Sequence, residues 1–233
     1  MILTTVPIQE KSFQLVQRQL RRSLEGVDAY EIWLDALSKK DQTPERIFGY
    51  CSNWKSLTKA KLVLVCKDVR ESGKYVGTQH DKAVLLLAAA EAGVDFVDIG
   101  LHAGPKSIKT LVRGRGKARL ILSWHDFKGT PSSAVLKAKV EQMVILGADV
   151  VKVATTVNSS KDLERLVQLA LRMKQRRQPH IVLGMGPLGI LTRIFADWLG
   201  NELNFVSLNA QTAPGQLSLA EMKNFQTLFS LRP

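Results

Sequence analysis

One lysine lies in the middle of an apolar, β-branched run of the chain. The run 147–156 reads Gly-Ala-Asp-Val-Val-Lys-Val-Ala-Thr-Thr, a composition that predicts a buried strand. A lysine in such a strand either extends to solvent or loses hydration in an interior cavity, and there the neutral amine becomes accessible near pH 7. A neutral amine attacks carbonyl carbons to form imines. Lys152 is therefore a candidate imine-forming lysine, although a structural lysine at a strand end fits the same pattern.

Several other polar side chains follow the ends of predicted strands. The clearest is His125, which ends the expected strand before that of Lys152. A lone histidine at a strand end is more commonly structural, but beside an imine-forming lysine it becomes a candidate for proton transfer. The remaining candidate residues at such ends are Glu31, Trp33, Asp35, Lys67, Glu71, Ser123, Gly186, Gly189, Arg193, Thr212 and Gln216. The two glycines would equally suit a phosphate-binding loop, and Asp35 and Asp126 suit loop anchors.

Eight strand–helix pairs are expected to position these residues. The predicted strands span 1–6, 29–35, 61–66, 95–99, 119–125, 147–156, 180–185 and 203–207. The predicted helices span 12–24, 43–53, 81–92, 105–112, 132–146, 160–176, 188–199 and 218–228. This alternation predicts an α/β chain folded as one (β/α)8 TIM barrel domain over 1–233, whose working residues lie at the carboxyl ends of the strands. An open doubly wound sheet is the alternative, but the first turn lacks a dinucleotide-binding glycine pattern.

Composition narrows the partners. The chain has 233 residues, 45% of them hydrophobic, and a formal charge of +12. The cations are dispersed over helix ends and one loop, without interleaved aromatic residues, so we predict no nucleic-acid partner. No apolar run reaches membrane-spanning length, and the N-terminus lacks a signal-peptide pattern. Cys51 and Cys66 lack metal-ligand spacing, so we predict no metal site. Two cysteines without a disulfide pattern are typical of a reducing compartment, so we predict a cytoplasmic protein.

Taken in order along the chain, these pieces resemble the type I 3-dehydroquinate dehydratase family. The matching pieces are Glu-Ile-Trp-Leu-Asp (31–35), Lys67 with Glu-Ser-Gly (71–73), Ser-Trp-His-Asp-Phe (123–127), Val-Lys-Val-Ala (151–154), Met-Gly-Pro-Leu-Gly (185–189) running to Thr-Arg (192–193), and Ala-Pro-Gly-Gln (213–216). The resemblance covers nearly the whole chain. It implies the dehydration of 3-dehydroquinate to 3-dehydroshikimate in the shikimate pathway, a lyase reaction without metal or cofactor, and a homodimer.

The resemblance also implies a division of labour among the catalytic residues. Lys152 would form an imine with the ring ketone, and the protonated imine would act as an electron sink. His125 would then remove the neighbouring proton and later protonate the departing hydroxyl. Glu71 would hydrogen-bond His125 and stabilise its imidazolium form.

Substrate binding falls to a second group of residues under the same resemblance. Arg193 would bind the substrate carboxylate through its planar guanidinium, helped by the helix N-terminus after the two glycines. The hydroxyls and the carboxylate would also bind Thr212, Gln216 and, on the far edge of the ring, Glu31.

The chain departs from the family pattern at two of its substrate-binding positions. Trp33 and Lys67 stand where the family usually carries arginines. Lysine keeps the charge but loses the two-pronged geometry, and the indole offers one donor. Two other interpretations stay open, a class I aldolase-like imine-forming lyase and a non-catalytic anion-binding barrel.

Overall fold

The eight strands lie side by side in one parallel sheet. The computed structural model describes residues 2–208 and 211–229, and the strand order is β7-β6-β5-β4-β3-β2-β1-β8. The strands are β1 (Leu3–Ile8), β2 (Ala29–Trp33), β3 (Lys61–Val65), β4 (Phe96–Gly100), β5 (Arg119–Asp126), β6 (Val150–Thr156), β7 (His180–Met185) and β8 (Leu203–Phe205). The first and last strands pair in parallel, and an isolated bridge joins His180 to Asn201. The predicted (β/α)8 barrel is thereby confirmed, with the ring of strands nearly closed.

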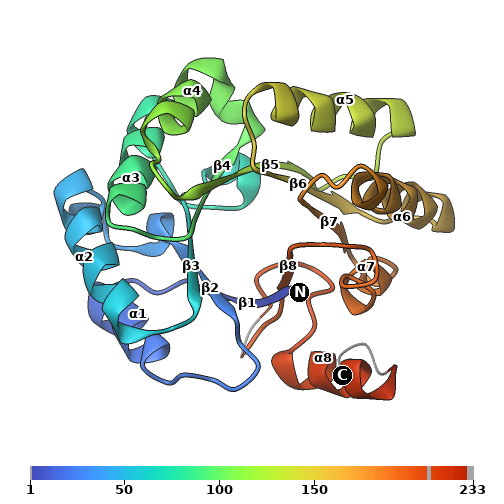
Figure 1. Cartoon of the computed structure of the whole chain (residues 1–233), viewed down its shortest axis with the longest axis horizontal. Helices are drawn as coiled ribbons and strands as arrows, with labels where there is room; N and C mark the ends of the chain where they lie inside the picture. The colour runs from blue at the N-terminus through green and yellow to red at the C-terminus, as the bar shows by residue number, and fades with distance from the viewer. Residues whose placement is uncertain (1, 209–210, 230–233) are drawn as a thin grey trace. The chain divides into compact units, whose positions relative to one another are not determined.

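Helices follow the strands in alternation (Figure 1). They are α1 (Phe13–Leu20), α2 (Pro44–Leu57), α3 (Gln79–Glu91), α4 (Gly104–Gly114), α5 (Ser133–Ile145), α6 (Ser160–Gln175), α7 (Ile190–Ile194) and α8 (Leu219–Leu228). Four short 3₁₀ turns are η1 (Leu34–Ala36), η2 (Lys39–Asp41), η3 (Val69–Glu71) and η4 (Leu101–Ala103). Serine and threonine caps begin most helices, and α6 and α8 carry full capping boxes.

The described residues divide into two compact units. One contains those of Met1–Val6, Trp124–Val144 and Val150–Pro233, and the other those of Pro7–Ser123 and Ile145–Asp149. In the second unit the β3 segment Leu62–Val65 is fully buried, and Phe13, Tyr50 and Trp54 stack where α1 meets α2. In the first, β6 pairs with β7 along its length and α6 packs on β7. A single domain over 1–233 stays a prediction.

The helix predicted over 188–199 is wrong in length. It spans five residues, Ile190–Ile194, and turns follow it as far as Gly200. After Ile194 the amides of Ala196 and Gly200 donate to the carbonyls three residues earlier, at 3.4 and 2.9 Å, which is the bonding of successive turns and not of a continuing α-helix. Strand β2 likewise ends at Trp33, because residues from Leu34 enter a 3₁₀ turn.

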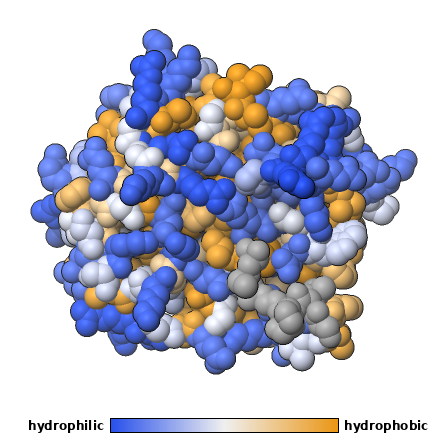
Figure 2. Space-filling view, viewed as in Figure 1, coloured by the Kyte–Doolittle hydropathy of each residue, from blue (hydrophilic) through white to orange (hydrophobic). Residues whose placement is uncertain are grey.

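The surface is mostly polar on the face drawn in Figure 2, with scattered apolar residues between. Both cysteines are buried free thiols. The predicted basic loop after α4 lies at the amino end of β5, where Arg115 forms an ion pair with Asp149. Among the described residues, no helix has the length and apolar character needed to cross a membrane.

Candidate active site

Three of the predicted substrate-binding residues touch one another at the ends of β2 and β3. Glu31 and Trp33 share a face of β2, and the indole Nε1–H donates to Glu31 Oε2 at 2.8 Å. Lys67, two residues after β3, places its Nζ 4.0 Å from the centroid of the Trp33 ring. All three side chains are buried, so the carboxylate, the indole and the ammonium form one pre-assembled polar group.

Asp35 anchors the loop that carries the next residues. Its carboxylate accepts from the backbone amides of Lys67 at 2.9 Å and Lys74 at 3.0 Å. Burial raises the pKa of Asp35, against the lowering effect of these two amides. Asp35 therefore has the contacts expected of a loop anchor.

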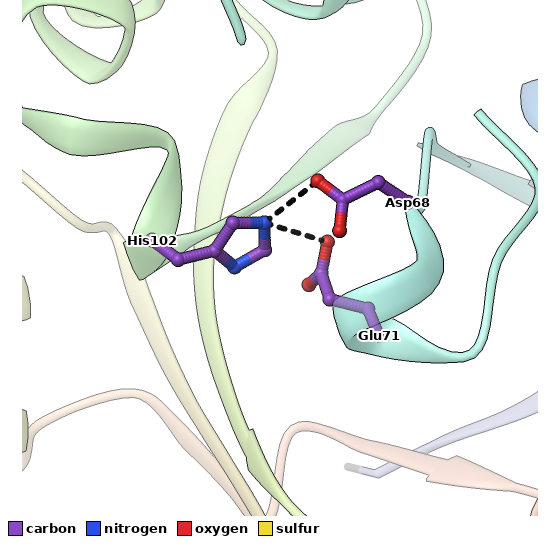
Figure 3. Close-up of side chains that lie close together, drawn as sticks. All are labelled: Asp68, Glu71 and His102. Atoms are coloured by element: carbon purple, nitrogen blue, oxygen red, sulfur yellow. Dashed lines mark hydrogen bonds and ion pairs between the residues drawn. The ribbon is translucent and has the colours of Figure 1, made fainter. Parts of the chain in front are cut away.

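Glu71 ends the 3₁₀ turn η3 and is buried at 4% exposure. Burial raises its pKa to about 7, and the Lys82 ammonium, 3.5 Å from Glu71 Oε2, opposes that rise. His102 Nε2 lies 3.5 Å from the same oxygen and 3.0 Å from Asp68 Oδ2, so the imidazole faces both carboxylates (Figure 3). A carboxyl group that titrates near neutral pH is suited to proton-transfer chemistry.

Asp68, Lys82 and His102 are the site residues that sequence reasoning missed. Lys82 is fully buried on α3 and donates to Asp68 Oδ2 at 2.9 Å. A lysine inside the alanine-rich helix was the available signal, because helices in such a position otherwise bury apolar side chains. Asp68, Glu71 and His102 could together ligate a cation, but the Lys82 ammonium already occupies that place, so we assign no metal to this cluster.

Lys152 is buried on β6 in the other unit. Its exposure is 4%, and its Nζ lies 4.4 Å from the centroid of the Phe205 ring on β8. The pairing of β6 with β7 places Lys152 opposite Ile181. Ile181 and the Phe205 ring are thus two apolar neighbours of this buried lysine.

His125 lies near the carboxyl end of β5 and is only partly buried. Its ring is stacked with that of Phe127, with centroids 6.0 Å apart and planes 8° apart. The following loop is held by Asp126, which accepts from the amides of Lys128 and Gly129. Asp126 thus anchors the loop that follows His125.

Arg193 is a buried cation on α7. Its exposure is 2%, its Nε has no hydrogen-bond partner, and burial lowers the pKa of the guanidinium to about 10. Among the residues that the structure describes, no carboxylate forms an ion pair with it. Asn204 donates to the backbone carbonyl of Arg193 and so fixes the helix, not the charge. An uncompensated buried guanidinium is suited to binding an anion.

Thr212 and Gln216 form a small closed loop after β8. The amide and the hydroxyl of Thr212 donate to Gln216 Oε1 at 2.7 and 3.0 Å. The loop lies against the turn before α7, since the Gly186 amide donates to the Pro214 carbonyl at 3.2 Å. Gly215 has φ +75°, and a Cβ there would lie 2.5 Å from the Gly186 carbonyl oxygen, so glycine is required for this approach.

The structure thus brings the predicted residues together in groups. Glu31, Trp33 and Lys67 are in direct contact, as are Thr212 and Gln216. Glu71 contacts residues that had not been predicted, and Arg193 lies on the helix that follows the Gly186 turn.

Comparisons with known proteins give relatives that match along almost the whole chain. A sequence model described as type I 3-dehydroquinase matches residues 4–232. A 3-dehydroquinate dehydratase of Coxiella burnetii is 32% identical over 220 residues, covering 94% of this chain and 90% of its own. One from Methanosarcina barkeri is 31% identical over 228 residues, covering 95% and 92%.

The solved structures share the fold. A 3-dehydroquinate dehydratase from Geobacillus kaustophilus superposes with a TM-score of 0.90 at 24% identity, covering 99% of this chain and 92% of that one. The order of motifs, the barrel that carries them and the match over almost every residue lead to one conclusion: the chain belongs to the type I 3-dehydroquinase family.

Proposed function

We propose that this chain is a hydro-lyase that converts 3-dehydroquinate to 3-dehydroshikimate, a step of the shikimate pathway, through an imine on Lys152. The observation that carries the proposal is the buried lysine on β6, in a chain that matches the family over residues 4–232. The aldolase-like and non-catalytic interpretations are not favoured, because the curated relatives of similar length are 3-dehydroquinate dehydratases.

The proposed reaction releases one water molecule from the substrate. The neutral amine of Lys152 attacks the ring ketone, and water leaves as the protonated imine forms. The cationic nitrogen withdraws electrons, so His125 can remove a proton from the adjacent carbon and an enamine results. The enamine expels the β-hydroxyl, which leaves as water with a proton from His125. Water then hydrolyses the imine, which frees the product and restores the lysine.

Glu71 is proposed to be the carboxylate that stabilises the imidazolium form of His125. In that role the carboxylate must carry its charge when the imidazole takes up the proton. A pKa of about 7 means that Glu71 is only partly charged at neutral pH. Activity should therefore depend on pH in the neutral range.

Arg193 is proposed to bind the substrate carboxylate. Its guanidinium is buried without an ion pair among the described residues, so the substrate would supply the missing anion. Thr212 and Gln216, on the loop that contacts the turn before α7, are proposed to bind the carboxylate or a ring hydroxyl. Glu31, Trp33 and Lys67 are proposed to bind the hydroxyls on the opposite edge of the ring.

The decisive experiment is borohydride reduction in the presence of 3-dehydroquinate, followed by intact mass measurement and peptide mapping. A reduced adduct on the peptide that contains Lys152, together with formation of the enone product, supports the proposal. An adduct without enone formation would favour the aldolase-like interpretation. No adduct and no turnover by folded protein would favour the non-catalytic anion-binding barrel.

A homodimer and a cytoplasmic location also belong to this proposal. The two free thiols support a reducing compartment. Light scattering coupled to gel filtration tests the dimer, and fractionation of the source cells tests the location. A monomer, or enzyme recovered outside the cytoplasm, would contradict the respective proposal.

A further inference from the structure

Four charged or titratable side chains besides Glu71 meet around its carboxylate. Lys82 comes from α3 and His102 from η4, Asp68 is the N-cap of η3, and Lys67 follows β3 by two residues. Asp98 on β4 also acts on this carboxyl group and disfavours its charge. With Lys82 bridging two carboxylates at 2.9 and 3.5 Å, the cluster has a built-in counter-ion.

Asp68 keeps that counter-ion in place. Burial disfavours its charge, but hydrogen bonds from Arg70, Lys82 and Gln79 outweigh burial and lower the pKa of Asp68 well below its ordinary value. Asp68 therefore stays charged at any pH at which the enzyme works and fixes the Lys82 ammonium at one point. Arg70 contacts Asp68 at 2.8 Å from the solvent side, and its side chain is more than half exposed.

His102 faces the same carboxylates as a neutral donor. Burial lowers its pKa, although Asp68 opposes that effect, so the ring is uncharged at neutral pH. Since Nε2 faces two carboxylate oxygens, this nitrogen carries the proton and donates to Asp68 Oδ2 at 3.0 Å, with Glu71 Oε2 3.5 Å away (Figure 3).

The end of β4 has no side chain where this contact forms. A Cβ on Gly100 would lie 2.5 Å from Glu71 Oε1 and 2.5 Å from His102 Cε1. Any larger residue would therefore push the imidazole and the carboxylate apart. The position of the His102 ring beside the Glu71 carboxylate therefore requires glycine at position 100.

From this geometry we propose that Lys82, Asp68 and His102 are positioning residues for the Glu71 carboxylate, of which Lys82 favours its charged form and Asp68 and His102 fix the arrangement around it. None of them need touch the substrate. Lys82 supplies the positive charge, Asp68 fixes that charge in place, and His102 restrains the orientation of the carboxylate. The proposal rests on the catalytic role proposed for Glu71 and assigns new residues to it.

The test uses two substitutions with opposite expected effects. Lys82→Met removes the cation that favours ionised Glu71, so the pKa of Glu71 and the acidic limb of the kcat profile should rise by roughly 1–3 pH units. Asp68→Asn removes a neighbouring negative charge, so that Glu71 becomes the only carboxylate of this pair that contacts Lys82. The pKa of Glu71 and the acidic limb of the kcat profile should therefore fall. Lys61→Met is the matched control, because Lys61 pairs with Asp95 away from this cluster. Its profile should match that of the unmodified enzyme.

The role of His102 is tested by two substitutions, one that removes the hydrogen-bond donor and one that keeps a donor. His102→Phe should lower kcat about tenfold while leaving KM unchanged, since a hydrogen bond to a charged group is lost. His102→Gln retains a donor and should recover part of the loss. Equal losses in both variants would overturn the role given to the Nε2 proton.

Direct titration separates this proposal from the proposed function. The ¹³C carboxyl signal of Glu71, identified by its absence in Glu71→Gln, reports the pKa without substrate. Opposite shifts in the two charge variants support the network even if the unmodified enzyme does not turn over 3-dehydroquinate. If the enzyme is active but neither charge variant shifts the Glu71 carboxyl signal or the acidic limb of the kcat profile, the proposed network is overturned and the proposed function is not. If Lys82→Met fails to fold, the nearly isosteric Asp68→Asn decides the question.

Discussion

The buried charge of Arg193 should lower the free energy of unfolding of the protein. We consider Arg193→Met, which keeps the length of the side chain and removes its charge. Burial lowers the guanidinium pKa well below its ordinary value, to about 10, and at about 1.4 kcal/mol per unit this corresponds to roughly 3 kcal/mol against the folded state. Both values lie far above pH 7, so the penalty is fully present at neutral pH. The penalty disappears only as the pH rises above about 10, towards the ordinary pKa of a guanidinium.

The methionine variant should therefore be the more stable protein. Because an apolar side chain of similar length removes the cost of burying an unpaired charge, we expect a gain of about 1–3 kcal/mol in the free energy of unfolding. For a chain of this length that raises Tm by roughly 2–12 °C. The same variant should lose a charged hydrogen bond to the substrate carboxylate, worth about 1.5–3 kcal/mol, and KM should rise about 10-fold to 150-fold.

Thermal unfolding and steady-state kinetics on one preparation test both halves of this prediction. Arg176→Met is the matched control, because Arg176 is an exposed arginine after α6 in the same unit. Its stability should change by at most about 0.5 kcal/mol, with unchanged KM. A lower Tm together with an unchanged KM for Arg193→Met would refute the reasoning, because it would mean that the guanidinium is compensated in the free enzyme.

Three further predictions concern the chemistry and the hydroxyl-binding group. Lys152→Ala should abolish the borohydride-trapped adduct and nearly all turnover, whereas His125→Ala should still form the adduct and stall; wild-type turnover by the latter would exclude His125 as the base. Trp33→Arg should lower KM by up to about tenfold, because the guanidinium adds hydrogen-bond donors worth about 0.5–1.5 kcal/mol each. Glu31 would offset the second positive charge beside Lys67. Loss of activity would instead mean that the indole is an adapted part of the site. Product formation, followed by enone absorbance, should survive exhaustive EDTA treatment, and inactivation by the chelator would contradict a metal-free reaction.

Much of the fold could be predicted from the chain alone. Strand β7 begins and ends at the predicted residues, and most other boundaries differ by a few positions. β-branched runs bounded by glycines, and serine or threonine caps before amphipathic segments, are local signals that need no tertiary information. The helix predicted over 188–199 was wrong in length because the backbone after Ile194 forms successive turns, with amides bonded to carbonyls three residues earlier, and apolar periodicity does not distinguish these from an α-helix.

The order of polar residues along the strands was likewise determined by the sequence. Because parallel strands place their carboxyl ends at one rim, a lysine, a histidine and two carboxylates at strand ends already indicated imine and proton-transfer chemistry. The resemblance to one family followed from the same residues. The types of the functional groups are a property of the chain itself.

The electrostatic state of those groups was decided only by the tertiary structure. Glu71, Lys82 and His102 lie on three different elements, and their distances from one another depend on how η3, α3 and η4 pack. A sequence records which residues are acidic or basic, but hydration and neighbouring charge set a pKa, and both depend on burial. That is why a carboxyl that titrates near pH 7 and a buried guanidinium without an ion pair among the described residues emerged only from the folded chain.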